Sequence, residues 1–264
     1  MRHLLARDGL AAVDDLLQRR PLLAFDFDGT LAPIVAQPDK ARVPPGIARR
    51  LAALAERLPV AIVSGRARAD LGPRLGFTPH FLVGNHGAED IADGPALAAA
   101  PDEPTPHAHQ LDALRRQLAG AAGRLAAAQV AVEDKGASIA LHYRMARDRT
   151  VAAALIAGLL EPADPALRVF GGKMVVNVMA ADAPDKAASV RDLVARAGCD
   201  SALFAGDDVN DEPVFASAPA DWLTVRIGRD EPQSLARWFL DGTAEVPVLL
   251  EHMLALQARR KSLK

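Results

Sequence analysis

The segment LLAFDFDGT, residues 22–30, ends a run of apolar residues with two aspartates, Asp26 and Asp28, two positions apart. An apolar run without alternation is typical of a strand buried on both faces, as in a parallel sheet. Two negative charges at the end of such a strand repel each other unless a cation neutralises them. The sequence therefore predicts a buried parallel strand that carries carboxylates to a site with a positive partner.

Four other short apolar runs have the same character, and they span 59–65, 80–85, 201–208 and 223–228. Between some of them lie segments with apolar residues at helical spacing, 44–58 and 185–198. Strand, helix and strand in succession predict an α/β fold with a parallel sheet and right-handed crossovers. We therefore expect a Rossmann-like core.

Polar clusters follow three of these predicted strands. They consist of Asp26 and Asp28, then Ser64, Gly65 and Arg66, then Asp207, Asp208 and Asp211. In open α/β sheets, ligands bind outside the carboxyl ends of the strands, so these clusters are expected to meet at one site. Ligand sets made only of oxygen favour Mg²⁺ over zinc. The sequence thus predicts a magnesium site at this edge of the sheet.

A different pattern fills residues 105–181. We expect helices over 109–128 and 147–160, strands over 129–135 and 137–144, and a hairpin over 167–180 that turns around Gly171 and Gly172. These elements predict a compact α+β cap inserted into a core formed by 1–104 and 182–264. The proline-rich stretch 100–109 is expected to mark the first boundary.

The ordered set of DFDGT, VSGR, Lys186 and GDDVNDE resembles the four-motif signature of the haloacid-dehalogenase-like phosphohydrolases. The resemblance implies a phosphatase in which Asp26 is the nucleophile and Asp28 is first the general acid and then the general base. Ser64 and Lys186 would hold phosphoryl oxygens, and Asp211 would orient Lys186. The implied magnesium site is formed by Asp26, Asp28 through its backbone carbonyl, Asp207, and Asp208 through metal-bound water.

Within that superfamily, GNHGAE (84–89), VEDKGASIALHYR (132–144) and GGKMVVNV (171–178) resemble the trehalose-6-phosphate phosphatases. The resemblance implies that Glu133 and Lys135 of the cap bind the sugar. Asn177 stands where the family has a third cap residue, a glutamate. The expected substrate-binding residues are Gly29, Gly65, Arg66, His86, Glu133, Lys135, Arg144 and Asn177. Other departures from the family pattern are Met179 and Ala180 for Arg-Pro, Ala187 for Gly, and Asn210 for Thr.

The expected activity is therefore Mg²⁺-dependent hydrolysis of trehalose 6-phosphate to trehalose and phosphate through an aspartyl phosphate. Asn177 keeps open another glycosyl phosphate as substrate, sucrose 6-phosphate or mannosyl-3-phosphoglycerate. A non-catalytic sugar-phosphate-binding module is disfavoured, because Asp26, Asp28, Lys186 and Asp207 are all present. A phosphomutase is disfavoured because no extra basic cluster is seen for a second phosphate.

The composition bounds the partners. Thirty-one basic and 33 acidic side chains give a formal net charge of −2, which is unlike the basic face of nucleic-acid-binding proteins. The single cysteine, Cys199, excludes an internal disulfide and fits a reducing cytosol. No signal peptide is recognised, and no apolar stretch approaches the ~20 residues that span a bilayer. We expect a cytoplasmic monomer with a small sugar phosphate as substrate, and neither nucleic acid nor membrane as partner.

Overall fold

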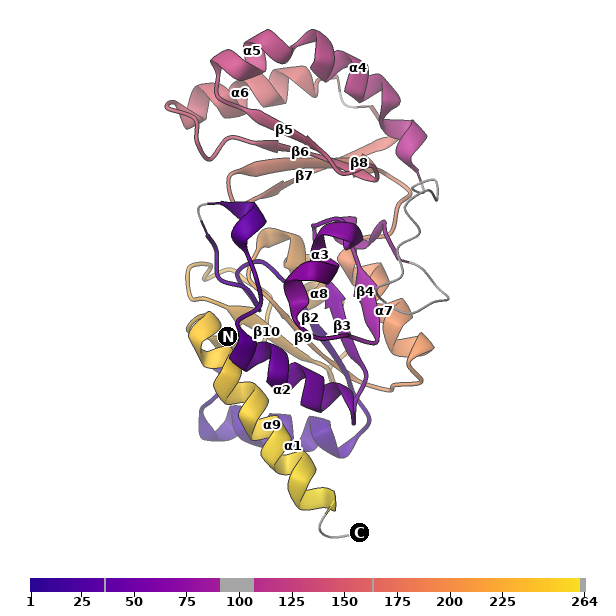
Figure 1. Ribbon diagram of the computed structural model, residues 1–264, viewed down its shortest axis with the longest axis vertical. Coiled ribbons are helices and arrows are strands. Elements are labelled where there is room, and N and C mark those ends of the chain that lie inside the picture. Colours follow the sequence, from indigo (N-terminus) through magenta and orange to yellow (C-terminus); the bar gives the residue numbers. More distant parts are fainter. Residues whose placement is uncertain (36, 91–106, 163, 262–264) are drawn as a thin grey trace. The chain divides into compact units, whose positions relative to one another are not determined.

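The computed structural model describes residues 1–35, 37–90, 107–162 and 164–261. These residues form two compact units, one made of 1–90 and 185–261 and the other of 107–184, each with its own hydrophobic core (Figure 1). The predicted cap boundary between 104 and 105, and the stretch 100–109 as far as residue 106, lie outside the described residues. Within the described ranges, no helix is both long and apolar enough to cross a membrane.

The first unit contains a seven-stranded sheet in which every strand pair is parallel. In spatial order its strands are β1 (Arg2–His3), β11 (Trp238–Leu240), β10 (Leu223–Ile227), β9 (Ala202–Gly206), β2 (Leu22–Phe25), β3 (Val60–Val63) and β4 (Phe81–Val83). The predicted α/β fold class is confirmed, and β2 lies at the centre of the site edge because β9 and β3 flank it.

Helices cover both faces of this sheet (Figure 1). One face packs against α1 (Arg7–Gln18), α2 (Pro45–Ala55), α3 (Arg68–Leu75) and α9 (Val246–Lys261), and the other against α7 (Lys186–Arg196) and α8 (Glu212–Ser217). The residues of β2 divide between the two cores, Leu23 and Phe25 on the first side and Leu22 and Ala24 on the second. Burial on both faces explains why the strand shows no polar alternation.

The N-terminal segment begins with the short strand β1 and continues into the helix α1. Arg2 and His3 pair in parallel with Trp238 and Phe239 of β11, so the helix begins only at Arg7. The two-residue strand β1 and the three-residue strand β11 were not predicted, because runs this short carry no readable periodicity.

The second unit is a four-stranded antiparallel sheet with helices. Its strands are β5 (Ala131–Asp134), β6 (Ser138–His142), β8 (Val175–Ala180) and β7 (Leu167–Gly172) in spatial order, and its α-helices are α4 (Asp112–Gly120), α5 (Ala122–Ala127) and α6 (Arg149–Leu159). The predicted helix 109–128 is in fact a short 3-10 turn, η3 (Ala108–Leu111), followed by α4 and α5. Gly120 ends α4, which fits the low helix propensity of glycine.

The hairpin of this unit turns later than predicted. Gly171 and Gly172 are the last residues of β7, and the turn lies at Lys173 and Met174. Met174 adopts a positive φ of 62°, a conformation that glycine accepts more easily than methionine does. The prediction, which relied on the two glycines, therefore placed the turn two residues too early.

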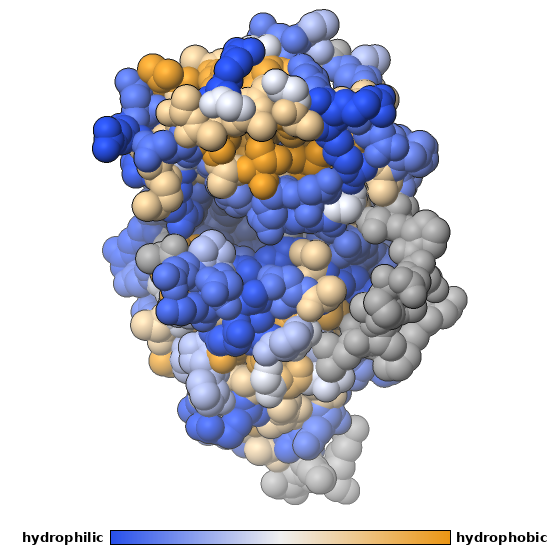
Figure 2. All heavy atoms as spheres, turned by 45° about the horizontal axis from the view of Figure 1, so that its top comes forward, coloured by the Kyte–Doolittle hydropathy of each residue, from blue (hydrophilic) through white to orange (hydrophobic). Residues whose placement is uncertain are grey.

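Alternation along the strands gives the antiparallel sheet two different sides. Ile139 and Leu141 pack into the core under the helices. On the same side, Val132 of β5 borders an apolar groove of about 370 Å³ that α4 and α5 also line. Figure 2 shows apolar side chains (orange) gathered on the surface of this unit. Successive side chains of a strand point to opposite faces of the sheet, and the neighbours of Glu133, Val132 and Asp134, both line this groove. Glu133 therefore lies on the face opposite the helices.

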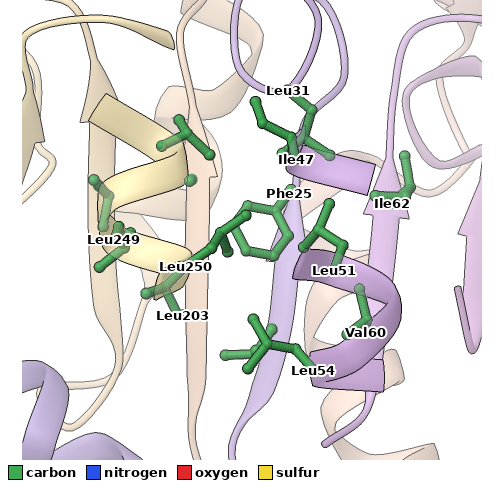
Figure 3. Close-up of a cluster of buried hydrophobic side chains, with 14 of the residues drawn as sticks. Phe25, Leu31, Ile47, Leu51, Leu54, Val60, Ile62, Leu203, Leu249 and Leu250 are labelled. Carbon is green, nitrogen blue, oxygen red and sulfur yellow. The ribbon is translucent and has the colours of Figure 1, made fainter. Parts of the chain in front are cut away.

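We expect Leu51→Ala to destabilise the first unit by about 2–5 kcal/mol, the usual cost of a truncated core leucine. Leu51 is fully buried in α2 and lies near Phe25 of β2 and Leu54 (Figure 3). Both tryptophans of the chain, Trp222 and Trp238, lie in this unit, so urea unfolding followed by tryptophan fluorescence measures its stability alone.

The matched control is Val248→Ala in α9, where the side chain is 54% exposed. We expect a change within about 0.5 kcal/mol for this surface position. Equal changes for the two variants would contradict the assignment of Leu51 to the core.

Candidate active site

Asp26 sits at the carboxyl end of β2 and is nearly buried, with 5% of its surface exposed. Its backbone N–H donates to the carbonyl of Ala205 in β9, at 2.8 Å. The ladder between β2 and β9 thus continues one residue past the strand, and this fixes the position of the aspartate. As the sequence predicts, an apolar strand carries the carboxylate to the ligand-binding edge of the sheet.

Gly29 makes the sharp turn that follows. Its φ of +76° lies in the left-handed region, and a Cβ built there would lie 2.1 Å from Oδ2 of Asp207. Any side chain would therefore collide with the carboxylate at the end of β9. The glycine of DFDGT is required because it lets the loop after β2 approach Asp207.

The segment after β9 brings three further aspartates to this edge. Asp208 caps the 3-10 helix η4 (Val209–Asp211): its side chain accepts from the N–H of Val209 at 2.8 Å, and Asp211 accepts from the N–H of Asp208 at 3.0 Å. This reciprocal capping box explains the order Asp208, Asp211 in the sequence. Asp207 and Asp211 are buried, whereas Asp208 is only half-buried.

Lys186 joins these segments through its ammonium group. It is the first residue of α7 and is only 2% exposed. Its Nζ donates to Oδ1 of Asp26 at 2.8 Å and to Oδ1 of Asp211 at 2.7 Å. Side chains from three distant parts of the chain are thereby held together in a buried ion-pair cluster.

This cluster holds more carboxyl groups than positively charged groups. Burial lowers the pKa of Lys186, but the neighbouring charges of Asp211 and Asp26 outweigh burial and raise it, so the lysine is charged. Burial raises the pKa of Asp26 well above its usual value; Lys186 opposes this, and the charges of Asp211 and Asp207 add to it. One ammonium therefore does not neutralise the carboxylates around it.

A divalent cation fits this arrangement. Carboxylate oxygens of Asp26, Asp207 and Asp211 lie within 4.8 Å of one another, and all three residues are buried. The donors are hard oxygens, the type that Mg²⁺ prefers. The structure includes Asp211 in this carboxylate cluster, whereas the side chain of Asp208 serves the helix cap. The ligand assignment made from the sequence stays a prediction.

The loops after β3 and β4 lie side by side. Ser64 is fully buried, and its carbonyl accepts from the N–H of His86 at 2.9 Å, while its Oγ accepts from the N–H of Arg66 at 3.2 Å. A Cβ at Gly65 would lie 2.3 Å from Cε1 of His86, so the imidazole packs directly on the glycine. Ser64, Gly65 and His86, predicted as site residues, are thus brought together, with the ring of His86 buried.

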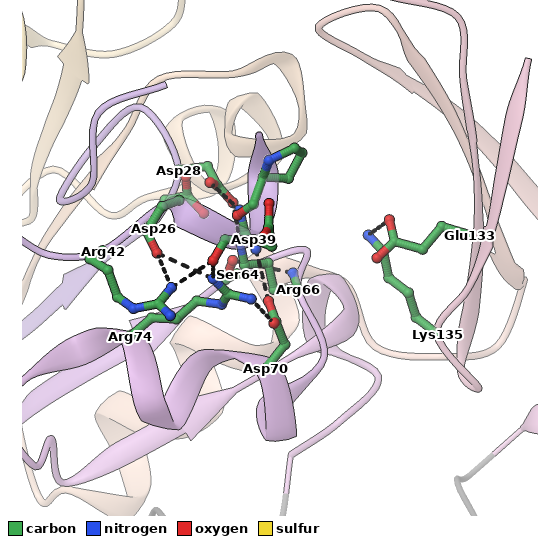
Figure 4. Close-up of polar contacts among 12 residues, drawn as sticks. Asp26, Asp28, Asp39, Arg42, Ser64, Arg66, Asp70, Arg74, Glu133 and Lys135 are labelled. Carbon is green, nitrogen blue, oxygen red and sulfur yellow. Dashed lines mark hydrogen bonds and ion pairs between the residues drawn. The ribbon is translucent and has the colours of Figure 1, made fainter. Parts of the chain in front are cut away.

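Arg66, which the sequence predicts to bind substrate, contacts Asp28 (Figure 4). Its Nε donates to Oδ2 of Asp28 at 2.6 Å and its Nη2 to Oδ1 at 2.8 Å. A further hydrogen bond reaches Asp70, which also receives one from Arg74. Asp70 and Arg74 were missed in the sequence, although the spacing of four residues from Arg66 to Asp70 and on to Arg74 is a helical ion-pair signal.

The cap residues predicted to bind the sugar belong to the second unit. Oε2 of Glu133 lies 3.7 Å from Nζ of Lys135 (Figure 4). The same oxygen lies 2.9 Å from Nε2 of His142. Asn177 of β8 pairs across the sheet with Ala140, which in turn pairs with Glu133, so Asn177 and Glu133 share one row of the sheet. These polar residues gather on the face opposite the helices.

Arg144 lies apart from this row. It follows β6 in an exposed turn, where its Nη2 donates to the carbonyl of Lys173 at 3.2 Å. It therefore connects the end of β6 to the turn between β7 and β8.

Comparison with known proteins places these features in one family. The family model described as trehalose-phosphatase matches residues 24–221. The trehalose-phosphate phosphatase of Mycobacterium tuberculosis (strain H37Rv) is 35% identical, over 98% of this chain and 67% of that protein.

Solved structures show the same fold. A trehalose-6-phosphate phosphatase of Aspergillus fumigatus superposes with a TM-score of 0.61 at 25% identity, covering 97% of this chain and 100% of that one. The C-terminal domain of the C. albicans trehalose-6-phosphate phosphatase gives a TM-score of 0.74 at 21% identity, covering 97% and 98%. Since the family model and a curated relative both cover most of the sequence, the chain belongs to the trehalose-phosphatase family of phosphoric monoester hydrolases.

Proposed function

We propose that this chain is a Mg²⁺-dependent phosphatase that hydrolyses trehalose 6-phosphate to trehalose and phosphate. The observation that carries the proposal is the position of the Lys186 ammonium between Asp26 and Asp211, in a buried carboxylate cluster at the carboxyl edge of a parallel sheet. The substrate is suggested by the names of the relatives, which are trehalose-phosphate phosphatases.

The first half of the reaction transfers the phosphoryl group to Asp26. One of its carboxylate oxygens forms a bond to phosphorus while the bond from phosphorus to the sugar oxygen breaks. Asp28 gives a proton to that sugar oxygen, which leaves as an alcohol. The product of this half is an aspartyl phosphate.

The second half releases phosphate. Asp28, now a carboxylate, takes a proton from a water molecule whose oxygen bonds to phosphorus, and the bond between phosphorus and Asp26 breaks. Asp26 returns as a carboxylate and Asp28 as an acid, so the cycle closes without a further reactant.

Lys186 and Ser64 are proposed to hold phosphoryl oxygens during both halves. An ammonium group has three donors, so Lys186 can bind a phosphoryl oxygen while it keeps its hydrogen bonds to Asp26 and Asp211. Positive charge fixed beside the reacting group stabilises the negative charge that develops in the transition state.

Asp26, Asp207 and the backbone carbonyl of Asp28 are proposed to bind the Mg²⁺ ion, with Asp208 acting through metal-bound water. When bound, the ion supplies positive charge that offsets the repulsion between the carboxylate of Asp26 and the anionic phosphate. Asp211 contributes by holding Lys186 in place, because its buried carboxylate accepts a hydrogen bond from Nζ.

The inserted segment 105–181, which falls almost wholly within the second unit, is proposed to act as a cap that selects the leaving group. On the sheet face opposite its helices, Glu133, Lys135, His142 and Asn177 offer both hydrogen-bond donors and acceptors, as recognition of sugar hydroxyls requires. Arg144 is proposed to help at the end of β6. Asn177 both donates and accepts, whereas the glutamate of the family pattern only accepts, so sucrose 6-phosphate is the rival substrate to test.

We expect Asp26→Asn to lower kcat for phosphate release from trehalose 6-phosphate by at least about 10⁴-fold, because the amide is not a nucleophile for phosphorus. Phosphate release is measured with Mg²⁺, and again after its removal with EDTA, when wild-type activity should fall to the same low level. Persistent activity without a divalent cation would contradict the metal assignment.

The matched control for that variant is Asp192→Asn, which makes the same change on the exposed surface of α7, where Asp192 pairs with Arg196. Its activity should stay within about twofold of the wild type. Substantial turnover by Asp26→Asn beside an unaffected control would rule out Asp26 as the nucleophile.

For the cap, we expect Glu133→Gln to lower kcat/KM for trehalose 6-phosphate by about 10- to 200-fold, because a hydrogen bond to a charged group contributes about 1.5–3 kcal/mol. With p-nitrophenyl phosphate, which has no sugar, the two proteins should act alike. Parallel assays with sucrose 6-phosphate decide the substrate: a higher kcat/KM for it in the wild type would keep the reaction and overturn trehalose 6-phosphate.

A further inference from the structure

Arg66 binds three different segments of the first unit at once. Its guanidinium donates twice to Asp28, once to Asp70 at 2.8 Å, and once to the carbonyl of Pro38 at 2.9 Å (Figure 4). Four hydrogen bonds occupy most of the five N–H donors of the group. The side chain is 13% exposed, and its guanidinium carbon lies 5.2 Å from the centre of the Phe27 ring. Arg66 is therefore committed to protein contacts.

The contact with Asp28 has the geometry of a fork. Nε and Nη2 each meet a different carboxylate oxygen, at 2.6 and 2.8 Å. Such a bidentate pair fixes the plane of the carboxyl group as well as its position, which a single hydrogen bond or a lysine does not. Asp28 lies on the loop beyond β2, so this contact is what ties its side chain to α3 and its preceding loop.

The other end of Arg66 is anchored in turn. Asp70 of α3 accepts from both Arg66 and Arg74. Burial raises the pKa of Asp70, but the hydrogen bonds from Arg74 and Arg66 outweigh burial and lower it, so this anchor stays charged. Arg74 also donates to the backbone carbonyls of Asp39 and Ala41, which belong to the same loop as Pro38.

We propose that Arg66 is a positioning residue for Asp28 and not a ligand of the substrate phosphate. It holds the carboxyl group that transfers the proton in a set orientation, and it joins that group to α3 and to the loop at Pro38–Ala41. This role rests on the proposed function, because it needs Asp28 to be the general acid. It replaces the substrate-binding role that the sequence predicts for Arg66.

The proposal predicts an effect that depends on the leaving group. The oxygen of a sugar hydroxyl group is a poor leaving group unless it receives a proton, whereas 2,4-dinitrophenolate leaves readily as an anion. Loss of a positioning residue for the acid should therefore slow sugar release and leave dinitrophenolate release almost unchanged. Loss of a phosphate ligand would slow both, because the phosphoryl group is the same.

The experiment measures the first turnover with Mg²⁺, for the wild type, Arg66→Gln and Arg66→Lys. Rapid quench follows trehalose release from trehalose 6-phosphate, and stopped flow follows the burst of dinitrophenolate from 2,4-dinitrophenyl phosphate. We expect Arg66→Gln to slow trehalose release by about 10²-fold, as misplacement of a catalytic group does. The dinitrophenolate burst should change less than about threefold, and KM for trehalose 6-phosphate should change little. Arg66→Lys should recover part of the lost rate.

A control and a mutant cycle complete the test. Arg196→Gln removes another arginine with two aspartate partners, at the far end of α7, and should not alter either rate. Asp28→Asn should slow trehalose release, and adding Arg66→Gln to it should slow release little further, because both changes remove one interaction.

Equal slowing of both leaving groups, a rise in KM alone, or additive effects in the cycle would overturn the proposal. If the wild type released the phenolate but no sugar from any sugar phosphate, the proposed function would fail, and the role of Arg66 with it. If the wild type releases trehalose and Arg66→Gln slows that release without slowing the dinitrophenolate burst, the result supports both the proposed function and the role of Arg66.

Discussion

The buried contact between Lys186 and the carboxylates of Asp26 and Asp211 is the interaction on which the rest of the site depends. It joins the end of β2, the start of α7 and the 3-10 helix after β9. A buried ion pair adds little stability over a well-packed apolar group, but the loss of one partner leaves an uncompensated charge and costs about 3–5 kcal/mol. The fold therefore tolerates this cluster only as a complete set. That requirement suits a site that must present ordered charge to an anionic substrate.

Much of the core could be predicted from the sequence because its strands are buried on both faces. β2, β3 and β9 appear as continuous apolar runs, and the helices between them carry apolar residues on one side. The two-residue edge strand β1 could not be predicted, since its partner β11 lies more than 200 residues further along the chain and the pairing leaves no local pattern. Its neighbour β11 has only three residues, too few to show a periodicity. In the second unit, Gly171 and Gly172 suggested a turn that the chain makes at the next two residues.

In the candidate site, too, some residues could be predicted from the sequence and others could not. The motifs identified Asp26, Ser64, Lys186 and Asp207, because residue type and position at a strand end or helix start were enough. The contacts of Arg66 were not predictable, because both Arg66 and Asp28 have several possible partners and only the tertiary structure selects among them. For Asp211, the family resemblance implies that it orients Lys186, and in the structure its carboxylate accepts a hydrogen bond from Nζ of that lysine. The capping box does not separate Asp208 from Asp211, because it engages both side chains.

The first unit is discontinuous, since residues 107–184 separate its two parts, and this has a consequence for synthesis on the ribosome. When β2, β3 and β4 have emerged, β2 still lacks β9, its neighbour on the other side. The nascent sheet then exposes an unpaired apolar edge, the kind of surface that promotes aggregation. Asp26 likewise lacks its partner Lys186 until that residue, which precedes β9 in the chain, has been synthesised. The antiparallel unit, by contrast, has a contiguous sequence and can complete its core first. A ribosome stalled before β9 would thus hold a folded antiparallel unit beside an unfinished parallel sheet.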